Sequence, residues 1–84
     1  MHAIELLPSA ARELAKLDRA IQRRVARRLG QLAEDPRGGG AIKLRGDVDI
    51  WRARVGDHRI LYRIEDDRLV VLIFRIAHRR EAYR

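Results

Sequence analysis

The chain changes its hydrophobic period once, and this change is the feature that most constrains its fold. Between residues 10 and 32, apolar side chains recur every three or four positions, which is typical of helices that bury one face. From residue 50 to residue 77 they alternate with polar side chains or run continuously, which is typical of strands. Asp35-Pro36 and three consecutive glycines separate the two regions and predict a helix end followed by a loop. Helices followed by adjacent strands indicate the α+β class.

The first half of the chain predicts a strand and two helices. Residues 2–7 are short and mostly apolar, and Pro8 ends them, so we expect an N-terminal strand. Ser9 is expected to cap the first helix and Asp18 the second. Helices joined this closely form a hairpin, and we expect their apolar stripes to cover one face of a sheet.

The second half predicts a three-strand antiparallel meander, at residues 50–55, 59–64 and 69–77. The last segment is apolar on both faces and is therefore expected to be central in the sheet. Eighty-four residues allow one hydrophobic core, so residues 1–84 are expected to form a single domain.

Composition narrows the classes of partner. The net charge is +7, and Lys16 and Lys43 are the only lysines, so nearly all of the positive charge comes from arginine. A guanidinium group can donate two parallel hydrogen bonds to one phosphate. Nucleic acid, an anionic membrane and an acidic protein all fit that charge. The chain has no cysteine, no apolar run long enough to span a bilayer and no sign of a signal peptide. We therefore expect a cytoplasmic protein without a transmembrane segment.

The strand pattern predicts an arginine face on the sheet. If a turn at residues 56–57 pairs Arg54 with Arg59, then Arg52, Arg54, Arg59 and Arg63 share the face that the helices leave uncovered. Like charges opposite one another destabilise a sheet unless an anion offsets them, so one interpretation is a face shaped around phosphate. The alternative is that these arginines only keep an exposed face hydrated.

Two further groups of basic residues stand out. Arg23 and Arg27, four residues apart on the second helix, belong to a basic ridge that could dock on phosphates or could simply be a hydrated helix face. The C-terminal tail brings His78, Arg79 and Tyr83 close together in sequence, and these side chains could serve chemistry or packing.

Three stretches carry a resemblance to a known family. They are Lys43-Leu44-Arg45-Gly46, the segment from Trp51 to Tyr62 (WRARVGDHRILY) and the segment from Ile76 to Arg84 (IAHRREAYR). Together with the strand, helix hairpin and meander, they resemble the RelE/ParE toxin superfamily over essentially the whole chain.

The resemblance implies the toxin of a type II toxin–antitoxin system, an endoribonuclease that cuts messenger RNA in the ribosomal A site. In this chemistry the ribose 2′-OH attacks the adjacent phosphate without a metal or other cofactor. The implied partners are a cognate antitoxin, the ribosome and messenger RNA. By position, Arg59 and Arg79 match arginines that hold the scissile phosphate, and Arg45 matches a substrate-positioning arginine. The full expectation is a catalytic group of Arg52, Arg54, Arg59, Arg79, Tyr83 and His78, with RNA binding by Arg45, Lys43, Arg23 and Arg27.

One departure from the family pattern affects the chemistry. Arg52 and Arg54 stand where active members often have lysine, and arginine stays protonated at any working pH. These two can stabilise a dianionic phosphorane but cannot take a proton. Tyr83 is therefore expected to be the base, with His78 as a candidate acid. Two other functions stay open: a ParE-like poison of DNA gyrase, and a basic module that binds nucleic acid without catalysis.

Overall fold

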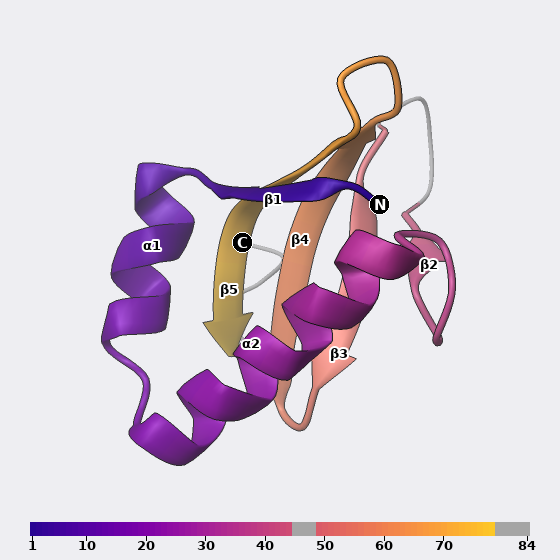
Figure 1. Cartoon of the computed structure of the whole chain (residues 1–84). Helices are drawn as coiled ribbons and strands as arrows, with labels where there is room; N and C mark the ends of the chain where they lie inside the picture. Colours follow the sequence, from indigo (N-terminus) through magenta and orange to yellow (C-terminus); the bar gives the residue numbers. More distant parts are fainter. Residues whose placement is uncertain (45–48, 79–84) are drawn as a thin grey trace.

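The computed structural model describes residues 1–44 and 49–78, and within them the chain forms two helices packed against a five-stranded sheet (Figure 1). This confirms the α+β class and the order of strand, helix hairpin and meander. The elements are β1 (Ala3–Leu6), α1 (Pro8–Ala15), α2 (Arg19–Glu34), β2 (Ile42–Lys43), β3 (Trp51–Val55), β4 (His58–Glu65) and β5 (Val70–His78).

The sheet has the strand order β1-β5-β4-β3-β2. β3, β4 and β5 form the predicted antiparallel meander, and β1 lies parallel to β5 on its other side. The last strand is therefore interior to the sheet, as its two apolar faces predicted. The two-residue strand β2, which pairs with β3, was not predicted, because a segment this short carries no readable alternation.

The helix caps match the sequence in one case and not in the other. Asp18 caps α2 as predicted, with its carboxylate accepting a hydrogen bond from the Ile21 amide at 2.9 Å. The prediction for Ser9 was wrong, because α1 already begins at Pro8, whose fixed φ suits the first helical position. The Ser9 hydroxyl instead donates to the Phe74 carbonyl oxygen at 2.8 Å.

The core lies between the two helices and one face of the sheet. α2 contributes Val25, Leu29 and Leu32, while Ala10 comes from α1, and all four are buried. The sheet residues of the same cluster are Ala53, Val55, Ile60, Tyr62, Ile64, Val71, Ile73 and Ile76. The other sheet face is thus left outside the helical layer. No helix in the described part of the chain is long and apolar enough to cross a bilayer.

Helix α1 also protects the edge of β5 beyond the point where β1 ends. β1 pairs with β5 only as far as Ile73, so the following backbone groups need other partners. Besides the Ser9 bond to Phe74, the Glu13 carboxylate accepts a hydrogen bond from the Ile76 amide at 2.8 Å. Its second oxygen lies 3.0 Å from a guanidinium nitrogen of Arg75. One acidic side chain therefore fixes both the strand edge and the position of α1.

Tyr62 anchors the loop that leaves α2. Its hydroxyl donates to the Pro36 carbonyl oxygen at 2.6 Å, and its side chain is completely buried. Burial raises the pKa of the Tyr62 phenol to about 12, although the nearby charges of Arg28 and Arg37 oppose the shift.

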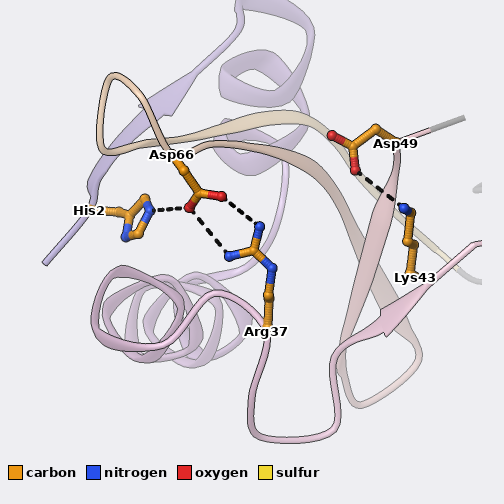
Figure 2. A network of polar contacts seen from close by, with 5 residues as sticks. All are labelled: His2, Arg37, Lys43, Asp49 and Asp66. Atoms are coloured by element: carbon orange, nitrogen blue, oxygen red, sulfur yellow. Dashed lines mark hydrogen bonds and ion pairs between the residues drawn. The ribbon is translucent and has the colours of Figure 1, made fainter.

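A surface network holds the same loop from outside (Figure 2). The Arg37 guanidinium donates to both carboxylate oxygens of Asp66, at 3.3 and 2.7 Å, and the His2 ring lies 3.1 Å from one of these oxygens. The hydrogen bonds from Arg37 and then His2 lower the pKa of Asp66. Arg37 also lies over the ring of Trp51, 5.8 Å from its centroid. The chain N-terminus, the loop after α2 and the β4–β5 turn thus meet at one point.

Candidate functional site

The predicted arginine face exists on the sheet surface that faces away from the helices. Arg54 lies directly opposite Arg59 across β3 and β4, and Arg52 lies opposite Leu61. The intervening residues Ala53 and Ile60 are completely buried in the core on the other side. Strand register and burial therefore confirm the predicted placement of these arginines.

The four arginines of this face differ in how far they are exposed to solvent. Arg54 and Arg63 are exposed, whereas Arg52 and Arg59 are partly buried. The Nε of Arg59 is buried, and it has no hydrogen-bond partner within residues 1–44 and 49–78. Arg54 and Arg59 make no ion pair with any carboxylate of that same part of the chain. A buried donor without a partner and a facing pair of like charges both favour a bound anion.

The basic ridge of α2 is also exposed, but only part of it faces the sheet. Arg23 and Arg27 are both exposed. Arg27 lines a cavity of about 200 Å³ that Arg23 does not reach. The cavity is lined by Arg24, Arg27, Arg28, Gln31, Arg54, Val55 and Gly56. The sequence did not indicate that strand and helix arginines would share one cavity, because that depends on how α2 crosses the sheet.

His78 does not join the arginine face. It pairs with His58 across β4 and β5, and strand alternation places both rings on the side of Ile60 and Ile76. The two rings meet edge to face with their centroids 5.8 Å apart. They line a separate cavity of about 280 Å³, together with Glu13, Lys16, Leu17, Ile76 and Ala77. The sheet therefore separates His78 from Arg59.

The remaining predicted residues fall into two groups. Lys43 lies in β2, where it is exposed and its Nζ is 4.0 Å from an oxygen of Asp49 (Figure 2). Arg45, Arg79 and Tyr83 lie outside the described residues. Within residues 1–44 and 49–78, no group of three or more His, Cys, Asp or Glu side chains could hold a metal ion.

Comparison with known proteins identifies the family. The family model described as the ParE toxin of the type II toxin–antitoxin system parDE matches residues 4–83. The chain belongs to the RelE/ParE toxin superfamily. Toxin RelG of Mycobacterium tuberculosis is 33% identical over 84 residues, covering 99% of this chain and 97% of the relative. A putative RelE-like toxin protein of Escherichia coli is 29% identical over 80 residues, covering 93% and 83% of the two chains.

Solved structures of RelE/ParE toxins share the fold. The toxin–antitoxin complex RelBE2 of Mycobacterium tuberculosis matches with a TM-score of 0.81 and 32% identity, over 92% of this chain and 96% of that one. The archaeal RelE–RelB complex of Pyrococcus horikoshii OT3 matches with a TM-score of 0.82 and 27% identity, over 96% and 98%. The isolated Escherichia coli RelE toxin, at 22% identity and a TM-score of 0.82 over 93% and 84%, shows the same fold. The resemblance that the sequence motifs indicated is thus confirmed.

Proposed function

We propose that this RelE/ParE toxin is a metal-independent endoribonuclease that cuts messenger RNA in the ribosomal A site. The observation that carries the proposal is the arginine pair Arg54 and Arg59, opposite each other on the sheet face away from the helices, with a buried Arg59 Nε that lacks a partner among the described residues. Named relatives at 33% and 29% identity are a RelG toxin and a RelE-like toxin, which supports the nuclease branch of the superfamily.

In the proposed reaction, the ribose 2′-oxygen attacks phosphorus and the bond to the 5′-oxygen breaks. The products are a 2′,3′-cyclic phosphate and a 5′-hydroxyl that takes its proton from water. The phosphorane gains negative charge as it forms, and Arg52, Arg54 and Arg59 supply positive charge where that happens. Because a guanidinium stays protonated, these side chains stabilise charge and do not move protons.

We assign to the Tyr83 phenolate the removal of the proton from the attacking 2′-hydroxyl, and to Arg79 a further contact with the phosphate. A tyrosine phenolate surrounded by guanidinium groups is stabilised, which makes the phenol a stronger acid and its conjugate base available at lower pH. His78 was the other candidate. Its ring lies on the helix side of the sheet beside His58, so we give it no step in this scheme.

RNA outside the scissile bond is proposed to contact Lys43 and Arg45 on one side and Arg23 and Arg27 of α2 on the other. Lys43, Arg23 and Arg27 are exposed, and Asp49 is the one carboxylate in the described chain that lies within 4.0 Å of any of them. Such contacts are to phosphates, so they set orientation and not codon preference.

We further propose a cognate antitoxin as partner, with both proteins acting in the cytoplasm. The Mycobacterium tuberculosis and Pyrococcus horikoshii relatives were solved as toxin–antitoxin complexes. A sheet face away from the helices, on which Arg54 and Arg59 have no carboxylate partner among the described residues, would suit an acidic antitoxin segment. Toxicity that persists unchanged when the chain is co-expressed with its partner would refute this part of the proposal.

A purified translation system tests the nuclease. Messenger 5′ ends are mapped by primer extension for the wild-type chain, for Arg59→Ala and for the double variant Arg79→Ala with Tyr83→Phe. We expect cuts within the translated frame that require ribosomes and disappear in both variants. Ribosome-independent cutting, or cutting that survives both variants, would refute the mechanism.

Poisoning of DNA gyrase is the second candidate, because the matching family model is described by its ParE members. It predicts inhibited supercoiling with intact messenger, which a gyrase assay run beside the translation assay would detect. A chain that binds RNA but leaves messenger, gyrase and growth unaffected would be a binding module without catalysis.

A further inference from the structure

The cavity between α2 and the β3–β4 turn has the composition of an anion site. Four of its seven lining residues are arginines, three from the helix and Arg54 from the strand. No acidic residue of the described chain lines it. Arg24 and Arg27 have no carboxylate partner within residues 1–44 and 49–78. Four positive charges therefore surround about 200 Å³, and no carboxylate of the described residues forms an ion pair with them.

The helical spacing and the loop after α2 hold this group in place. Arg24, Arg27 and Arg28 are three and four residues apart, so they project from one side of the helix. Arg28 donates to Gln31 at 3.1 Å and to the Gly39 carbonyl oxygen at 2.9 Å. Its partners are neutral, so the Arg28 guanidinium is positioned while its charge remains available to a ligand.

The hairpin turn is shaped to let a guanidinium approach its backbone. Gly56 has a φ of +56°, which favours glycine at the first central position of a two-residue hairpin turn. A methyl group at Gly56 would lie 3.4 Å from both terminal nitrogens of Arg24. The Arg24 side chain thus rests against the glycine backbone, and the turn forms one wall of the cavity.

The lining decides what kind of ligand fits. Among the described residues that line the cavity, Val55 is the one with an apolar side chain, it is itself buried, and none is aromatic. A nucleobase would lack a stacking surface here, and a peptide would lack a pocket for an apolar anchor. Guanidinium groups alone recognise a phosphate by charge and by paired hydrogen bonds.

We propose that this cavity binds a backbone phosphate of RNA, one or more nucleotides away from the scissile bond. Arg54 belongs both to the cavity and to the arginine face, so the two sites are continuous. The inference rests on the proposed function, because it takes RNA as the ligand. It assigns Arg24 and Arg28 to the RNA-binding surface and gives Arg27 a specific place in it.

The test compares two double variants that each remove two positive charges from one short segment of the chain. Arg24→Gln with Arg27→Gln alters the cavity and leaves Arg28 to hold the loop. Arg12→Gln on α1 with Lys16→Gln at the C-cap of α1 is the matched control, because both residues are exposed and outside the cavity. Binding of an uncleavable 2′-O-methyl RNA decamer is measured by fluorescence anisotropy from 0.05 to 0.3 M salt, and circular dichroism checks that each variant folds.

For single strands the logarithm of affinity falls with the logarithm of salt concentration by about 0.7 per phosphate contact. Losing one or two contacts should therefore flatten that slope by about 0.7 to 1.4. At 0.1 M salt the corresponding loss of affinity is roughly fivefold per contact. The control should change the affinity by less than about twofold, because it removes only long-range attraction.

Two probe ligands distinguish the source of the anion. Inorganic phosphate should shift the Gly56 amide resonance in wild type, should compete with the RNA and should have no effect in the cavity variant. Equal losses of RNA affinity in both variants would overturn the proposal. So would inorganic phosphate that saturates the cavity without displacing RNA, or a hexaglutamate peptide that binds there more tightly than the RNA.

The cleavage assay keeps this proposal separate from the proposed function. Wild-type chain that binds RNA through the cavity but leaves messenger intact would refute the nuclease alone. Messenger cut by wild type, with cavity and control variants alike in RNA affinity, would refute the cavity alone.

Discussion

Replacing Tyr62 with phenylalanine should lower stability at neutral pH and should remove a pH dependence at high pH. The hydroxyl is completely buried and donates to Pro36, whose carbonyl oxygen would lose that donor. A buried hydrogen bond of this kind contributes about 1–2 kcal/mol to the free energy of unfolding. We therefore expect the variant to be less stable by that amount at pH 7.

The difference in stability between wild type and Tyr62→Phe becomes smaller as the pH rises above 10. The phenol ionises near pH 10 in the unfolded chain and only near pH 12 in the folded one, so the folded state keeps the proton longer. Wild type therefore loses stability as the pH rises from 10 toward 12, by about 1.4 kcal/mol at pH 11 and at most about 2.7 kcal/mol. Phenylalanine has nothing to ionise, so the gap between the two proteins should close near pH 11.

The assay is urea denaturation at pH 7, 9, 10 and 11, followed by the fluorescence of Trp51, the single tryptophan of the chain. All other titrating groups are common to both proteins, so the difference in unfolding free energy isolates the residue 62 side chain. A gap that stays constant from pH 7 to pH 11 would refute the buried, protonated hydroxyl. A gap near zero at pH 7 would refute the bond to Pro36.

Three further predictions concern stability and titration. Gly56→Ala should cost about 1–2 kcal/mol because φ is +56°, lowering the thermal midpoint by roughly 4–16 °C, and an unchanged melting curve would contradict the turn geometry. Glu13→Ala should cost about 2 kcal/mol in urea denaturation because the Ile76 amide loses its acceptor, whereas Glu13→Gln, which can still accept one hydrogen bond, should cost less. In an NMR titration the Asp66 carboxyl should have a pKa below its usual value, and Arg37→Gln should raise that pKa again. Because the folded-state pKa of Asp66 is lowered, its contribution to stability is present above the unfolded-state pKa and is lost as the pH falls through the folded-state pKa.

The sequence predicted the arginine face because its evidence was local. A two-residue turn fixes the register of the strands on either side, so Arg54 had to face Arg59 once the turn was placed at Gly56. The parallel pairing of β1 with β5 and the cavity under α2 could not be predicted in the same way. Both depend on how separate elements pack against one another, and the hydrophobic period of each element does not predict that packing.

The position of His78 shows how one inserted residue can change the sheet face that strand alternation predicts for the side chains after it. Along β5, Val71 and Ile73 face the core, and strict alternation would bring Arg75 and Ala77 to the same side and His78 to the arginine face. The ladder between β4 and β5 instead shifts register, since Leu61 pairs with Arg75 while Tyr62 pairs with Ile73.

The extra residue in that step is Phe74, a β-bulge, and it turns every later side chain of β5 over. Ile76 then enters the core opposite Ile60, and His78 follows it to the helix side. Burying Ile76 in place of Arg75 offers a reason for the bulge, because strict alternation would put a guanidinium in the core and an isoleucine in water. The same apolar demand that closes the core therefore removes the imidazole from the arginine face, which is why the proposed scheme gives His78 no step.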